Sequence, residues 1–109
     1  MKKLAFALVL MPKLRAIADR ESRPVPALCP RIRLRVTDQA MPEETRLAGE
    51  GTLDQVRRDL EALQKLGASY VCLDTFADDV EGSRNHEAAW RMLAGLAERV
   101  LDLERESLR

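Results

Sequence analysis

Hydrophobic and basic residues alternate strictly over residues 31–37, in the order Arg-Ile-Arg-Leu-Arg-Val-Thr. Successive side chains of a strand point to opposite faces, so this period of two predicts a strand. Its apolar face holds Ile32, Leu34 and Val36. A second strand is predicted over residues 70–76, where Val, Leu and Thr alternate with Cys and Asp.

Helical periodicity brackets both strands. The first predicted helix covers residues 12–21 and opens on Pro12, and a Pro-rich extended connector follows it. The second begins after Thr52, which with Gln55 forms a capping box, and it carries leucines and a valine at helical spacing. The third is capped by Ser83, and its apolar stripe extends through residue 101. Helices that alternate with strands in this way predict parallel strands joined by crossovers.

The segment between the first strand and the second helix, residues 38–51, is a polar loop that is long for a connection without secondary structure. Loops of this length are often lids or binding loops, and we expect such a role here. At the N-terminus, basic Lys2 and Lys3 precede an apolar run over residues 4–11, as in a signal peptide. The run is too short to cross a membrane and Lys13 follows it, so we expect a helix instead.

Composition narrows the class of protein. Lys plus Arg and Asp plus Glu both number 18 and are mixed along the chain, so we expect neither a nucleic-acid nor a membrane partner. The two cysteines, Cys29 and Cys72, make no disulfide framework and have no metal-ligand spacing, so we expect packing thiols in a reduced, cytoplasmic protein. The acidic loop around residues 78–81 lacks ordered ligand spacing, and His86 has no second ligand nearby, so we expect no metal site.

Several short segments, in order, resemble the C-terminal end of the luciferase-like monooxygenase family. Residues 30–35 are similar to the second-last barrel strand of its deazaflavin-dependent relatives, and residues 90–94 to the closing helix. The core of the resemblance is Gly51-Thr52-Leu53-Asp54-Gln55-Val56, Leu66-Gly67-Ala68 and Tyr70-Val71-Cys72-Leu73-Asp74.

The resemblance implies an α/β fold: the last two parallel strands of a (β/α)8 TIM barrel, with their helices. Residues 30–109 would form these two units, and residues 1–29 an N-terminal helix and connector. A whole barrel needs about 250 residues, so the domain would be truncated. The family implies an oxidoreductase that uses flavin mononucleotide (FMN) or a deazaflavin coenzyme, inactive here unless a complementing barrel segment joins it. The alternative is a non-enzymatic remnant or a small self-associating α/β module.

Candidate coenzyme contacts follow from strand geometry within such a barrel. If the apolar faces pack on the helices, Arg31, Arg33 and Arg35 face inward with Asp74, and we expect Arg33 or Arg35 near Asp74. A buried arginine needs an anionic partner, which is either this carboxylate or a bound anion. Thr37 and Thr75 end the two strands, where active sites of such barrels lie. No catalytic residue is assigned.

Overall fold

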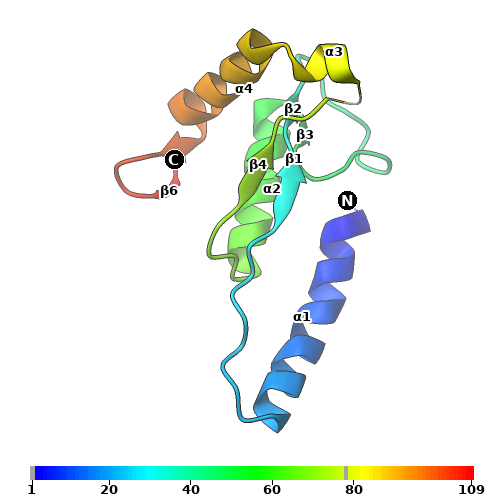
Figure 1. Cartoon of the computed structure of the whole chain (residues 1–109), viewed down its shortest axis with the longest axis vertical. Coiled ribbons are helices and arrows are strands. Elements are labelled where there is room, and N and C mark those ends of the chain that lie inside the picture. Colours follow the sequence, from blue (N-terminus) through cyan, green and yellow to red (C-terminus); the bar gives the residue numbers. More distant parts are fainter. Residues whose placement is uncertain (1, 78) are drawn as a thin grey trace.

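The computed structural model describes residues 2–77 and 79–109, with side chains from Val9 onward. It is a mixed α/β fold (Figure 1). The elements in chain order are α1 (Lys2–Arg20), β1 (Arg31–Arg33), β2 (Arg35–Val36), β3 (Glu50–Gly51), α2 (Leu53–Lys65), β4 (Cys72–Asp74), α3 (Val80–Ser83), α4 (His86–Arg99), β5 (Leu101–Asp102) and β6 (Ser107–Leu108).

The two predicted strands pair in parallel, as expected, although each is shorter than predicted. β1 lies beside β4 with Arg33 opposite Asp74, and β2 lies beside β3. The Leu34 amide donates to the Asp74 carbonyl, whereas the next amide, of Arg35, donates to the carbonyl of Gly49. Because consecutive amides of a strand point to opposite edges, β3 and β4 flank the β1–β2 segment on its two sides.

One face of these strands packs on the helices, as the alternation predicted. Ile32 and Leu34 are buried in a core that includes Val56 of α2 and Leu96 of α4, and Val36 packs against the same core. The opposite face carries the three arginines of residues 31–35. The structure thus confirms the prediction that the apolar side of the strands packs on the helices.

The capping box that begins α2 is also confirmed. The Thr52 hydroxyl accepts a hydrogen bond from the Gln55 amide at 3.2 Å, and the Gln55 carboxamide oxygen accepts one from the Thr52 amide at 3.1 Å. At the other end, Gly67 takes φ +91° directly after the last turn, a left-handed conformation that glycine adopts without strain. Both ends of the helix were thus correctly predicted from residue types.

The predicted boundaries of the outer helices were wrong. The helix expected for the N-terminal apolar run and the one predicted over residues 12–21 are a single helix, α1. Pro12 therefore lies in its interior and not at its start, because the Leu-, Ala- and Lys-rich residues before it favour helix. The C-terminal helix is divided: Ser83 ends α3, and Asn85 caps α4 by accepting from the Ala88 amide at 3.1 Å. The predicted helix continued past Val100, whereas residues 101–108 form the antiparallel hairpin β5–β6.

A contact distant in sequence accounts for the end of α4. The Arg57 guanidinium, on α2, donates to the carbonyl of Arg99 and, at 3.2 Å, to the carbonyl of Arg109. It thereby caps one free carbonyl of the last turn and ties Arg109 to the same place. Leu101 and Leu108 then face one another across the hairpin and pack against the core.

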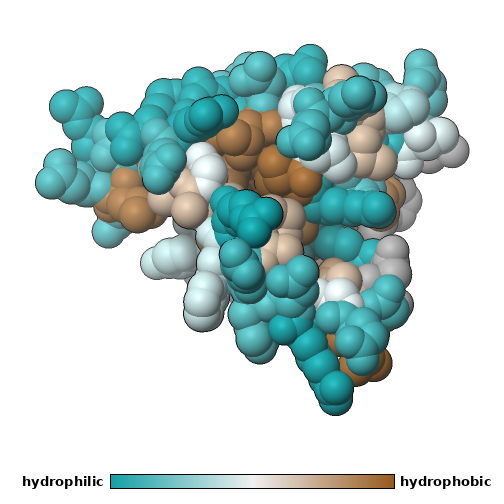
Figure 2. All heavy atoms as spheres, turned by 90° about the horizontal axis from the view of Figure 1, so that it is seen from above, coloured by the Kyte–Doolittle hydropathy of each residue, from teal (hydrophilic) through white to brown (hydrophobic). Residues whose placement is uncertain are grey.

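The remaining surface is mostly polar. Viewed from the end that carries α3 and α4, apolar side chains show between predominantly hydrophilic ones (Figure 2). Both cysteines are free and exposed, so the prediction that they serve as packing residues was wrong. None of the described helices is long and apolar enough to span a membrane.

Candidate functional site

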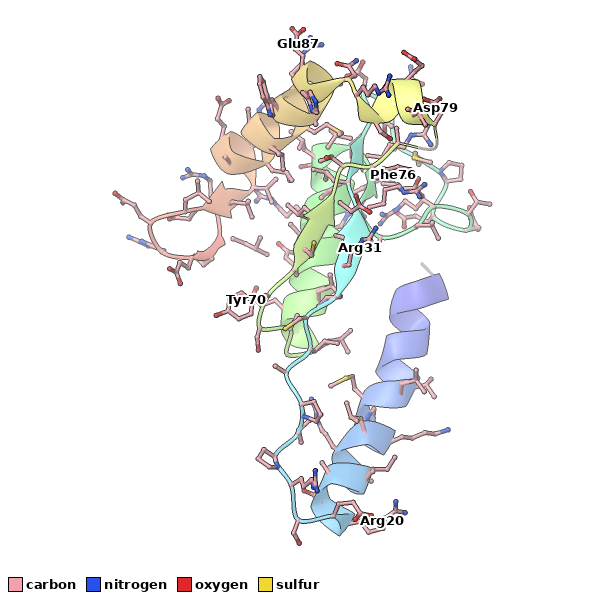
Figure 3. All side chains as sticks on the ribbon, viewed as in Figure 1. Arg20, Arg31, Tyr70, Phe76, Asp79 and Glu87 are labelled. Atoms are coloured by element: carbon pink, nitrogen blue, oxygen red, sulfur yellow. The ribbon has the colours of Figure 1, made fainter. Side chains whose placement is uncertain are left out.

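The polar face of the strands holds the predicted neighbours and an ion pair. Arg33 lies opposite Asp74 in the ladder, as predicted. The ion pair is made by Arg31, whose Nε and Nη2 lie 3.0 and 2.6 Å from the Asp74 Oδ2 (Figure 3). Both donors therefore reach the same carboxylate oxygen, from two positions earlier in the ladder. The Nη1 of Arg35 instead lies 3.9 Å from the Oε2 of Glu50.

Asp74 is held in its charged form. Its Oδ1 accepts a hydrogen bond from the Phe76 amide at 2.9 Å, and this bond is the main cause of a lowered pKa. The Arg31 guanidinium lowers the pKa of Asp74 further, and the nearby charge of Arg33 adds to the effect. In return, Asp74 raises the pKa of Arg31 above its ordinary value. This carboxylate is therefore an anchoring group and a poor proton acceptor.

A cleft of about 270 Å³ opens where the parallel strands end. Three of the five predicted coenzyme contacts line it: Arg33, Arg35 and Thr75. The remaining wall includes Asn85 and Met92 from the start and middle of α4. Figure 3 shows Phe76 and Asp79 on the chain that leaves β4 beside this end of the molecule. Two cationic side chains and a hydroxyl thus line one cavity together with the Asp79 carboxylate, and the two guanidinium groups suit an anionic group.

Thr37 lies in a separate place. It lines another cleft, of about 320 Å³, together with Arg57 and Arg99. Its hydroxyl donates to the Gln39 carbonyl at 2.7 Å and its amide to the Gly51 carbonyl at 2.8 Å. The structure therefore gives Thr37 a part in turning the chain away from β2, and it does not join the other predicted residues.

The most strongly bonded charged group is one that sequence patterns did not identify. Arg46, in the loop over residues 38–51, is buried against Asp59 of α2 with two parallel contacts: Nη1 to Oδ2 at 2.6 Å and Nη2 to Oδ1 at 2.7 Å. The Gly49 amide also donates to Asp59 Oδ2 at 2.9 Å. The Asp59 hydrogen bond is the largest influence on Arg46 and raises its pKa above the ordinary value.

A second set of contacts fixes the start of the same loop. Gln55 bonds the main chain of Met41 twice, accepting from its amide at 3.0 Å and donating to its carbonyl at 2.8 Å. Glu43 accepts from the Gln55 carboxamide at 3.1 Å and from Arg46 Nε at 2.9 Å, and these bonds lower the pKa of Glu43. These contacts tie the loop to α2. They do not support the expected role as a lid, because a lid needs a hinge.

One signal in the sequence pointed to the buried pair. Asp59 occupies the same helical face as Val56, Leu60 and Leu63, an acidic residue within an apolar stripe. A charge in that position requires a partner, because an isolated buried charge costs several kcal/mol. The identity of that partner, thirteen positions earlier in the loop, follows only from the folded structure.

The described residues contain no group of three or more His, Cys, Asp or Glu side chains that could hold a metal ion. His86 is exposed at the start of α4, where its ring stacks on Trp90 with centroids 6.4 Å apart. In comparisons with known proteins, no family model matches the chain, and no curated protein or solved structure matches it either. The resemblance to luciferase-like monooxygenases therefore stays a prediction from residues 30–109.

Proposed function

We propose that this chain is the C-terminal part of a luciferase-like oxidoreductase barrel that uses FMN or a deazaflavin, and that it is inactive without the rest of that barrel. The support comes from the parallel β1–β4 pair, from the helix that connects its strands, and from the cleft at the strand ends. That cleft, with Arg33, Arg35 and Thr75 on its wall, is the single observation on which the proposal depends most.

The cleft offers the chemistry that an anionic coenzyme needs. A guanidinium presents several N–H donors in a planar fork, which matches the oxygens of a phosphate or carboxylate. Arg35 remains 61% exposed and only loosely paired with Glu50, so it can turn toward a ligand at small cost. The protein's part in flavin chemistry is to bind and orient the ring, and these residues would hold its charged tail.

The same geometry supports the proposed lack of independent activity. Small-molecule sites normally enclose most of the ligand, and a reactive flavin ring needs walls on both sides. Here a short parallel segment supplies one wall, and Arg31 and Arg35 of its polar face are 71% and 61% exposed rather than enclosed in a barrel interior. Binding of the anionic tail alone would be weak and salt-sensitive.

A complementation experiment tests this proposal. The chain would be mixed with a luciferase-like monooxygenase truncated before its last two strand–helix units, and coenzyme binding would be followed by FMN or deazaflavin fluorescence. We expect quenching with the mixture, little with either part alone, and a weaker effect with Arg35→Gln. Arg91→Gln, an exposed arginine on α4, is the matched control. Tight coenzyme binding by the isolated chain, or no gain in the mixture, would contradict the proposal.

One observation favours the alternative, a self-associating module. An apolar groove of about 420 Å³ lies along the outer side of β4, between Leu60 and Val71 on one wall and Leu101 and Leu108 on the other. Among the described strands, β4 pairs only with β1, so its other edge is open to a second chain. Sedimentation over a range of concentrations distinguishes the two: a dimer that Leu73→Lys dissociates would favour the module.

A further inference from the structure

Helix α1 has two unlike sides. Met11 and Ala18, seven residues apart and hence on one side, are buried at 9% and 6% exposure. Val9, Lys13 and Ile17, each four residues from the next, lie on the other side, and all three are exposed. Figure 1 shows the helix standing apart from the strands and α2, connected to them by the extended chain after Arg20. The outer side therefore has no described neighbour.

The charge of this segment differs from that of the remaining chain. Residues 1–18 contain four basic residues, Lys2, Lys3, Lys13 and Arg15, and no acidic one. Since the whole chain has equal numbers of both kinds, the remaining residues carry an excess of four acidic ones. The expectation that anionic lipid is no partner rested on the charge balance of the whole chain, whereas the basic excess of residues 1–18 lies in α1.

We propose that α1 binds an anionic lipid surface with its outer side, lying in the plane of the interface. Val9 and Ile17 would enter the boundary between headgroups and acyl chains, and Lys13 between them would extend its ammonium group to the lipid phosphates. A lysine stem among aliphatic neighbours is a poor match for a dry protein interface, where lysine is depleted, but a good one for a lipid headgroup layer. The helix lies on the membrane rather than across it, in keeping with its hydropathy.

The two attractive contributions are separable. Each Lys or Arg close to an anionic surface contributes about 1 kcal/mol, which corresponds to roughly a fivefold change in the partition coefficient. Lys13→Gln should therefore weaken binding about fivefold, and glutamine preserves a good helix former at that position. Ile17→Ser removes an aliphatic anchor that is 47% exposed in solution, and it should weaken binding roughly fivefold.

The experiment is co-sedimentation of the full chain with vesicles of phosphatidylcholine and phosphatidylglycerol, compared with vesicles of phosphatidylcholine alone. We expect binding to the anionic vesicles only, and its loss in about 1 M salt, where the Debye length falls to about 3 Å. Lys65→Gln, at an exposed basic residue away from α1, is the matched control and should bind as the wild type does. Far-ultraviolet circular dichroism of each variant shows whether α1 remains folded.

Three results would overturn the proposal: no binding to anionic vesicles, equal binding to both kinds, or equal losses in the α1 and control variants. A second copy of the chain covering α1 would appear as an oligomer that persists with anionic vesicles and excludes them, and this also contradicts lipid binding. Failure here leaves the oxidoreductase proposal untouched, since the cleft and α1 share no residue.

Discussion

Removal of the Asp59 carboxylate is the sharpest test of what holds this small fold together. Asp59 is completely buried and accepts three hydrogen bonds, two from Arg46 and one from the Gly49 amide. The substitution Asp59→Ala leaves the Arg46 guanidinium, itself 3% exposed, without its main counter-ion. Glu43 contacts only Arg46 Nε, so the two Nη groups lose their carboxylate.

The magnitude follows from the asymmetry of buried pairs. Breaking such a pair from one side costs about 3–5 kcal/mol, because the orphaned charge stays in a low-dielectric environment. A chain of this length has a total stability of roughly 5–15 kcal/mol. The substitution should therefore remove a large share of the stability, and it should release the loop over residues 38–51 from α2. Replacing both partners, Arg46→Met with Asp59→Leu, should cost much less than the single change, because no charge is left buried.

Urea denaturation followed by circular dichroism measures these differences. The matched control is Glu87→Ala, which breaks an exposed pair with Arg91 one helical turn away and should cost only about 0.3–0.5 kcal/mol. A double-mutant cycle then gives the coupling energy between Arg46 and Asp59. The reasoning fails if Asp59→Ala costs less than about 1 kcal/mol, or if the double variant is less stable than Asp59→Ala alone.

Four further substitutions probe the local geometry. Gly49→Ala should destabilise by well over 1 kcal/mol, because Gly49 has φ +91° and a Cβ would lie 2.2 Å from a backbone carbonyl oxygen. Gly67 has the same φ but open space around it, so Gly67→Ala should cost only about 1–2 kcal/mol. Urea denaturation measures both changes. Thr52→Ala should cost about 1 kcal/mol and lower the thermal midpoint, because it removes the cap of α2. Folding lowers the pKa of Asp74, mainly through the Phe76 amide and then through Arg31. The charged carboxylate therefore stabilises the fold above its ordinary pKa of 3.8, and this stabilisation is lost as the pH falls from 3.8 through the lowered pKa. Asp74→Asn should thus flatten the acid limb of a stability–pH profile, and an unchanged limb would contradict this.

The parts of the fold that sequence patterns predicted are those fixed by local chemistry. The alternation around Ile32 and Leu34 gave a strand with its apolar side on the helices, and the capping box at Thr52 gave the start of α2. The end of α4 was missed because it depends on Arg57, more than forty positions away, which caps carbonyls that helical periodicity treats as continuing. The interior position of Pro12 was missed because favourable neighbours on both sides outweigh one lost hydrogen bond.

The candidate site was predicted in part for the same reason. Arg33, Arg35 and Thr75 meet at one cleft because the parallel register sets their strand ends side by side. Residue types on a strand do not, however, specify which of several arginines reaches a carboxylate. The contact of Arg31 with Asp74 depends on the direction of its side chain across the ladder, and the position of Thr37 depends on where the loop leaves β2.

The two edges of the parallel segment make opposite predictions for hydrogen exchange. On one edge, the loop returns through Gly49 to β3, and the amides of Arg35 and Thr37 donate to it, so they should exchange slowly. On the β4 edge, the Cys72 amide donates to the Pro30 carbonyl and so points toward β1. Because consecutive amides of a strand point to opposite sides, the Leu73 amide points to the unpaired edge of β4. Leu73 should exchange much faster than Leu34, which donates to the Asp74 carbonyl at 2.7 Å. Equal protection in a monomer would refute this arrangement of edges. Protection of the Leu73 amide could instead grow with protein concentration or on addition of a complementing segment. That result would show that a new strand has joined the outer edge of β4, which is unpaired among the described strands.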